Sequence, residues 1–197
     1  RAAAVALGVL GKDFRGVLVS DCLAVYDGLN PLQQKCYSHH LKAVSQAQES
    51  LGAAASDYLL QVQALLRTAI LLKAMQEPGE EERFAACVNT LRKEAHALLD
   101  VPRVQPIEEK VRTRLWKQRD HLFTFLERPE VPATNNLAER QLRPAVIARK
   151  ISCGNKTQKG AQAWAVLASL AATCQQTGRS VIDFISRRVL LQPASSP

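Results

Sequence analysis

The 197-residue sequence has few aromatic residues, one methionine and no long apolar run. Aromatic side chains make up only 5% of the chain while Ala, Leu and Val dominate, which favours helices over an all-β fold. No apolar run approaches the roughly 18 to 20 residues of a membrane span, and the N-terminal residues lack a signal-peptide cleavage site. We therefore expect no membrane partner. Because the sequence also lacks an initiator methionine and opens inside a helical pattern, we expect a fragment whose N-terminal part is missing.

The cysteines are odd in number and scattered along the chain, at positions 22, 36, 87, 153 and 174. Such an arrangement does not resemble a disulfide framework and suits a reducing compartment. The expected location is the cytoplasm.

Positive charge is concentrated in the last third of the chain. Residues 135–197 hold nine Lys and Arg against two acids, whereas residues 1–134 hold 17 bases against 16 acids. A basic segment on a nearly neutral body suggests a polyanionic partner, with nucleic acid first in line. A basic surface that only contacts solvent is the alternative.

The order of patterns predicts an α/β chain that is mostly helical. An apolar helix over 2–10 ends at Gly11, a short strand over 16–20 ends before Asp21, and a short helix and a turn at 28–31 lead to a second candidate strand in QQKCYSHH. Helices follow over 40–51, 53–76, 80–99 and 106–127, separated by Gly and Pro breakers, and this block shows no chemistry of its own. Pro144 bends or ends a helix that starts near 135, residues 145–160 form a loop or hairpin, and helices cover 161–177 and 180–191. The domains are then 1–40, 41–134 and 135–192, with a disordered tail at 193–197.

Two carboxylates could carry chemistry. Asp21 follows an apolar strand, and open α/β sheets bind their ligands at the carboxyl ends of strands, although an Asp at this position also commonly caps a helix. Glu139 stands three residues after Asn136, which is capping-box spacing, and four before Arg143, which permits a surface ion pair. Their hard oxygen ligands suit Mg²⁺ or Mn²⁺, and two such ions support phosphoryl transfer. Asp13 and Asp27 lie in turns and are weak candidates for a third acid.

Cys36, His39 and His40 have a metal-like spacing, but zinc would need further ligands such as Cys22 or Cys153, so a structural or substrate-contacting histidine is the simpler reading. Around Glu139 the sequence gathers polar and basic residues suited to DNA phosphates, or to a solvated loop: Asn135, Asn136, Arg140, Arg143, Arg149, Lys150, Lys156 and Lys159.

Together, two segments resemble the transposases of the bacterial insertion sequence 66 family, which use the DDE mechanism. In one, an apolar strand ends in Ser20 and Asp21, Tyr26 follows, and a Gln-x-Cys-aromatic-x-His motif spans Gln34 to His39. The other carries the core NNxAERxLRPxVIxRK, from Asn135 to Lys150. Thr134 departs from the family pattern, where Asp is frequent, and Lys42 replaces a frequent Arg.

The resemblance implies an RNase H-like core interrupted by a helical insertion. Asp21 and Glu139 would be the second and third catalytic acids and would bind Mg²⁺ or Mn²⁺, while His39 and the basic residues above would contact DNA. The partners would be transposon ends and target DNA, with a homo-oligomer assembled on them. The first catalytic Asp would lie upstream, so we expect the chain alone to be incomplete. The alternatives are a non-enzymatic DNA-binding module that uses the basic third, and a helical interaction protein.

Overall fold

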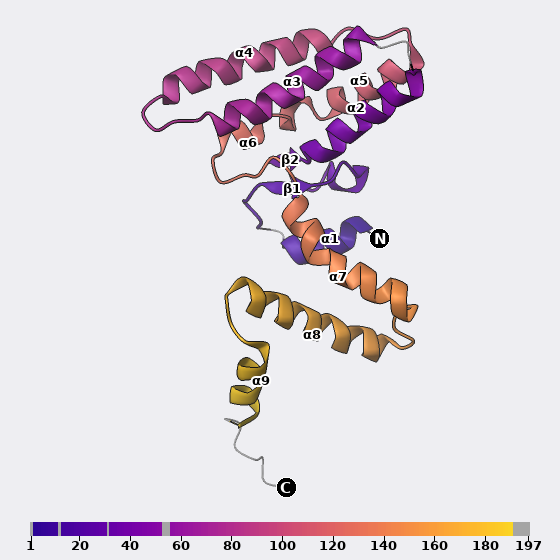
Figure 1. Ribbon diagram of the computed structural model, residues 1–197, viewed down its shortest axis with the longest axis vertical. Coiled ribbons are helices and arrows are strands. Elements are labelled where there is room, and N and C mark those ends of the chain that lie inside the picture. Colours follow the sequence, from indigo (N-terminus) through magenta and orange to yellow (C-terminus); the bar gives the residue numbers. More distant parts are fainter. Residues whose placement is uncertain (1, 12, 31, 53–55, 191–197) are drawn as a thin grey trace. The chain divides into compact units, whose positions relative to one another are not determined.

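The computed structural model describes residues 2–11, 13–30, 32–52 and 56–190. The chain forms two compact units, Arg1–Asn135 and Asn136–Pro197 (Figure 1). The predicted tail over 193–197, the start of the helix predicted from residue 53 and the end of the turn at residue 31 lie outside the described residues.

A pair of short parallel strands lies at the start of the first unit. Helix α1 (Ala2–Leu10) ends at Gly11, whose N–H donates to the Leu7 carbonyl at 2.9 Å and whose φ of 77° favours glycine. Strand β1 (Leu18–Ser20) pairs with β2 (Gln33–Lys35) in parallel, with Ser20 opposite Lys35. A 3-10 turn, η1 (Ala24–Tyr26), lies in the connection between them. The two predicted strands are therefore confirmed, and both carboxyl ends meet at one edge.

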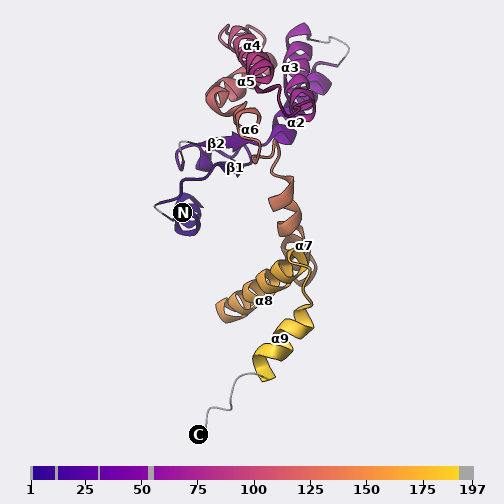
Figure 2. The same cartoon turned by 90° about the vertical axis from the view of Figure 1, so that its left-hand side faces the viewer.

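The rest of the first unit is a helical block, drawn from purple to orange in Figures 1 and 2. Its elements are α2 (Tyr37–Leu51), α3 (Asp57–Ala74), α4 (Glu81–Leu99), α5 (Pro106–Lys117), η2 (Arg119–His121) and α6 (Thr124–Glu127). Helix α3 is the central one, since its stripe from Leu59 to Ala69 is buried as its spacing predicts. The Ser56 hydroxyl caps α3 by accepting the Leu59 N–H at 3.1 Å.

The prediction of one helix over 106–127 is wrong, because the chain breaks at Gln118 and again before Thr124. The break has a tertiary cause. The Gln118 amide bonds the Asp27 side chain at 3.0 Å, and the Leu122 carbonyl accepts the buried Tyr37 hydroxyl at 2.6 Å. Long-range hydrogen bonds that satisfy buried groups outweigh the local preference for helix. The second predicted strand is also shorter than its pattern, since α2 begins at Tyr37.

The second unit contains α7 (Asn136–Ser152), α8 (Gln158–Gln176) and α9 (Val181–Leu190). Helix α7 continues through Pro144 and α8 begins at Gln158, so the loop or hairpin predicted over 145–160 is wrong for residues 145–152 and 158–160. Proline at this position removes one N–H donor, but the residues on both sides keep helical bonding. Gly178, with a φ of 65°, follows α8, and the Arg179 N–H donates to the Cys174 carbonyl at 2.8 Å. The chain is thus mostly helical, with one parallel strand pair.

No helix among the described residues is long and apolar enough to cross a membrane.

Candidate metal and DNA site

Asp21 stands directly beyond the carboxyl end of β1. The edge is closed by a main-chain bond, in which the Cys36 N–H donates to the Ser20 carbonyl at 2.9 Å. One carboxylate oxygen of Asp21, Oδ1, accepts the Leu23 N–H at 3.1 Å. This bond forms a local turn, but the N-cap of η1 is Leu23, so Asp21 does not cap that helix. A carboxylate has two oxygens and further lone pairs, so the same half-buried side chain retains capacity to bind a cation.

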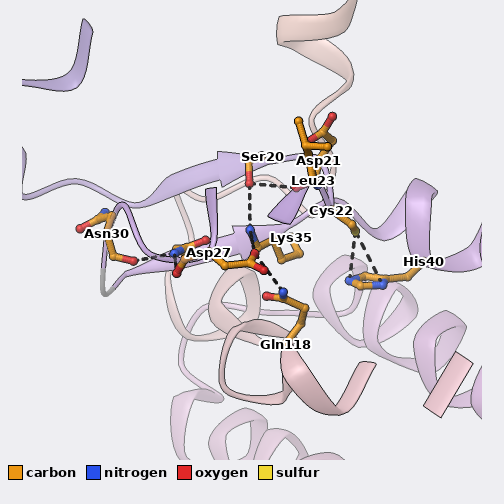
Figure 3. A network of polar contacts seen from close by, with 10 residues as sticks. Ser20, Asp21, Cys22, Leu23, Asp27, Asn30, Lys35, His40 and Gln118 are labelled. Atoms are coloured by element: carbon orange, nitrogen blue, oxygen red, sulfur yellow. Dashed lines mark hydrogen bonds and ion pairs between the residues drawn. The ribbon is translucent and has the colours of Figure 1, made fainter. Parts of the chain in front are cut away.

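Lys35, in β2, is fully buried beside this edge (Figure 3). Its ammonium lies 2.8 Å from Asp27 Oδ1 and 3.4 Å from the Ser20 hydroxyl oxygen. Asp27 Oδ1 also accepts from the Gln118 amide, so it already has two donors. A carboxylate oxygen that neutralises a buried ammonium is a poor ligand for a second cation. Asp27 Oδ1 is therefore engaged within the protein, and the exposed Asp13 lies in a turn before β1.

Sequence patterns did not single out Lys35 or Gln118. Lys35 occurs in the polar run Gln33–Lys35, which reads as an exposed strand, yet all three residues are buried. The Gln33 amide nitrogen donates to two carbonyls, and Gln34 Oε1 accepts the Phe125 N–H at 2.9 Å. The buried Gln33 Oε1 has no hydrogen-bond partner among the described residues. The only sequence signal for the ion pair between Lys35 and Asp27 is that these two residues lie on opposite sides of the turn at 28–31.

Cys22 and His40 lie against each other below the same edge (Figure 3). The Cys22 sulfur is 3.8 Å from His40 Nδ1 and 3.7 Å from Nε2, and Tyr37 meets the imidazole edge-on. Burial raises the pKa of the Cys22 thiol, against the opposing charge of Arg114, so the thiol stays protonated at neutral pH. This packing favours the structural reading of His40 over a zinc ligand.

Because His40 is buried, we expect the free energy of unfolding to depend on pH. Desolvation, followed by the positive charges of Arg114, His39 and Lys35, lowers its pKa from 6.5 to about 3. Between these values the unfolded chain binds a proton that the folded chain does not, so stability is present above pH 6.5 and is lost as pH falls. The lost free energy of unfolding is on the order of 1.4 kcal/mol per pH unit.

We expect wild type to lose more free energy of unfolding than His40→Gln when the pH falls from 7 to 5. Urea unfolding of both proteins at each pH measures this difference. Other titrating groups contribute equally to both chains and cancel in the difference. A difference that is constant over this range would contradict the buried neutral histidine.

The chain returns from the helical block to the same strand edge. The Tyr37 N–H donates to the Ala133 carbonyl at 3.0 Å, and the Asn135 N–H donates to the Cys36 sulfur at 3.2 Å. The half-buried His39 lies in the first turn of α2, where its N–H donates to the Cys36 carbonyl at 3.1 Å. The first unit thus gathers Asp21, His39 and Asn135 around residues 20 and 36. Because Cys36 already accepts a hydrogen bond and is buried, its role here is to anchor the backbone of residue 135.

Glu139 is exposed in the first turn of α7, which begins at Asn136, one residue earlier than the capping box would have it. At 100° per residue, four side chains fall within roughly 60° around the helix axis. They are Asn136, Glu139, Arg143 and Lys150. The carboxylate therefore shares its helix face with an amide and two cations, an arrangement that suits a phosphate group near a metal acid.

The remaining basic residues are exposed on other parts of the second unit: Arg140, Arg149, Lys156 and Lys159. Arg140 Nε donates to the Asn136 carbonyl at 3.3 Å, and Lys156 lies in the loop before α8. Arg149 instead lines an apolar cleft of about 380 Å³ between α7 and α8, together with Leu142 and Trp164. The basic residues are thus spread over α7, the loop that follows it and the first turn of α8.

The sequence model of the IS66 transposase family matches residues 1–163. The match includes the strand pair, the whole helical block and the acid-bearing part of α7. The chain belongs to the IS66 transposase family. Its membership agrees with the resemblance carried by the two motifs around Asp21 and Glu139.

Two curated relatives of this IS66-family chain come from Sinorhizobium fredii. The uncharacterized protein y4jO is 35% identical over 81 residues, which cover 41% of the chain and 25% of that protein. The uncharacterized protein y4qI is 27% identical over 157 residues, which cover 79% of the chain and 28% of that protein. The chain therefore spans about a quarter of the length of these relatives. No solved structure matches it.

Proposed function

We propose that this IS66-family chain is part of the catalytic region of a DDE transposase, which cleaves DNA at transposon ends and joins the freed strand to target DNA. The observation that carries the proposal is a family match that encloses two acids in suitable settings. Asp21 follows a parallel strand at its carboxyl end, and Glu139 shares a helix face with two cations. In this proposal the strand pair belongs to an RNase H-like core, which the helical block interrupts.

The two acids fit a hard divalent cation. Both are carboxylates, and Asp21 keeps lone pairs that the hydrogen bond from the Leu23 N–H does not use. A bound Mg²⁺ or Mn²⁺ pair would activate the attacking oxygen and stabilise the leaving one. Asp21 and Glu139 would hold the ions, while Arg143 and Lys150 would orient the DNA phosphates.

We propose that the 197-residue chain binds metal and DNA but does not complete strand transfer alone, because the resemblance identifies only two of the family's three acids in it, Asp21 and Glu139. Assembly as a homo-oligomer on DNA belongs to the same proposal.

Iron-directed backbone cleavage tests whether Asp21 and Glu139 share an ion. Ferrous iron in place of Mg²⁺, with ascorbate and peroxide, produces radicals that cut the chain near the bound metal. We expect cuts close to residues 21 and 139, suppressed by excess Mg²⁺ and mapped by mass spectrometry. Either Asp21→Asn or Glu139→Gln should remove both cuts. If each variant removes only the cut beside itself, the two acids do not share an ion.

A non-enzymatic DNA-binding module is the second candidate, and the compact basic second unit favours it. It predicts that DNA binding is independent of divalent metal and survives Asp21→Ala and Glu139→Ala. Failure to bind DNA at low salt would instead favour a helical interaction protein.

A further inference from the structure

The loop that carries Asp21 is held at several points. At its far end, the Gln33 amide donates to the Asp27 carbonyl at 2.9 Å and to the Asn30 carbonyl at 2.7 Å. The Asn30 amide donates to the Gly16 and Leu32 carbonyls, both at 2.8 Å. These bonds tie residues 27–30 to the segments that flank the two strands. The loop therefore has a set shape at the end away from Asp21.

At its near end, a chain of hydrogen bonds runs from a buried cation to the backbone of Asp21 (Figure 3). The Lys35 ammonium donates to the Ser20 hydroxyl, and the Ser20 hydroxyl donates to the Asp21 carbonyl at 3.0 Å. Lys35 has no exposed surface, so its position is fixed by the strand pairing around it. The Asp21 carbonyl is thus connected through the Ser20 hydroxyl to the side chain of Lys35, which solvent does not reach.

The helical block supplies the third point of support. Gln118, between α5 and η2, donates to the same Asp27 oxygen that pairs with Lys35. Nearby, the Phe125 N–H donates to Gln34 and the Leu122 carbonyl accepts from Tyr37. Residues 118–125 therefore contact both the Asp21 loop and β2. The block was expected to have no chemistry of its own, yet its returning segment lies directly against the candidate metal loop.

We propose that Ser20, Lys35 and Gln118 are positioning residues for the Asp21 carboxylate, so that the helical block supports metal binding. This inference rests on the proposed role of Asp21 as a metal ligand. An ion pair with a buried ammonium is weak evidence for stability, because removing the Lys35 charge from water offsets much of the attraction to Asp27. Its hydrogen bonds nevertheless fix one geometry, and groups that orient a metal ligand affect affinity without touching the ion.

The test compares Mn²⁺ affinity with stability in the 197-residue chain. Free Mn²⁺ is measured by electron paramagnetic resonance, and stability by thermal unfolding of each variant. We expect Ser20→Ala, Lys35→Met and Gln118→Ala each to raise the Kd for Mn²⁺, by about tenfold or more for the first two. Ser20→Thr keeps the hydroxyl and should retain the wild-type Kd.

Two matched controls separate positioning from stability. Ser56→Ala removes the cap of α3 and its bond to Glu108, so it should lower the unfolding temperature and leave the Kd unchanged. Lys73→Met removes a bond to the Pro129 carbonyl that is not part of the chain of bonds leading to Asp21, and it should also leave the Kd unchanged. If Lys35→Met does not fold, the Ser20→Ala, Ser20→Thr and Ser56→Ala set decides alone.

The outcomes distinguish the two proposals. Mn²⁺ binding that depends on Asp21 but is unchanged in Ser20→Ala and Lys35→Met would overturn the positioning role and leave the metal site standing. Wild-type Mn²⁺ binding that Asp21→Asn does not weaken would overturn both.

Discussion

Raising the salt concentration from about 50 to 200 mM should weaken binding of the chain to duplex DNA by roughly a thousandfold. The six exposed bases of α7, the following loop and the start of α8 carry this expectation: Arg140, Arg143, Arg149, Lys150, Lys156 and Lys159. If all six contact phosphates, the slope of log affinity against log salt is about −5, because each contact releases counterions. Fluorescence anisotropy of a labelled duplex across a salt series measures the slope.

Replacing two bases on the Glu139 face tests which side of α7 meets the DNA. Arg143→Gln with Lys150→Gln should reduce the slope by about 2 and weaken binding at every DNA sequence alike. The matched control is Arg83→Gln with Lys93→Gln, which removes the same two charges from exposed positions on α4. Equal slopes for the two double variants would show that net charge, and not the face of α7, determines binding.

Phe125→Ala should lower the free energy of unfolding by about 3 to 5 kcal/mol. Phe125 is fully buried and meets Tyr37 edge-on, with ring centroids 4.8 Å apart, and its N–H donates to Gln34. Its loss leaves a cavity where the helical block meets the strand pair and removes an aromatic contact. Small domains have only about 5 to 15 kcal/mol of stability, so this one change removes a large part of it.

Urea unfolding followed by circular dichroism measures that loss. Phe14→Ala is the matched control, because the Phe14 side chain is 36% exposed and packs over Gly16 at the surface of the same unit. We expect it to cost about 1 kcal/mol or less. Similar losses for both variants would contradict the central position of Phe125 in the core.

Much of the fold follows from local sequence signals. The apolar spacing of α3 predicts the buried stripe from Leu59 to Ala69, and Gly11 and Gly178 end helices at positive φ as expected. The short strand before Asp21 follows from its β-branched residues and the polar residue at its end. These features depend on neighbours in the sequence, which is why a single sequence reveals them.

Other features depend on contacts that no local pattern encodes. The break after α5 arises because Gln118 bonds Asp27, 91 residues away in the sequence. The sequence does not predict the burial of Lys35, because it lies in a run of three polar residues. Its burial depends on Asp27, which the fold brings near it. Pro144 gave the opposite error, because the helix was expected to bend or end there and instead continues. A helix tolerates the loss of one hydrogen bond when the residues on both sides are strong helix formers.

Some residues of the candidate site can be identified from the sequence, and others only from the tertiary structure. The family pattern identifies Asp21 and Glu139, and elementary geometry of a helix adds Arg143 and Lys150 to the Glu139 face. The residues that hold the Asp21 loop come from three separate segments, around positions 20, 35 and 118. Their joint role requires the tertiary structure, because each alone reads as an ordinary polar residue.

The helical block begins and ends at the same place. Tyr37 opens α2 and pairs with Ala133, while Cys36 pairs with Asn135, so entry and exit lie one hydrogen bond apart. A segment whose ends adjoin can change length or be exchanged without separating the segments that precede and follow it. Such a change would leave the strand pair in place, provided that residues near 118–125 still contact it. The same junction offers a site where a protein engineer could graft a different helical module.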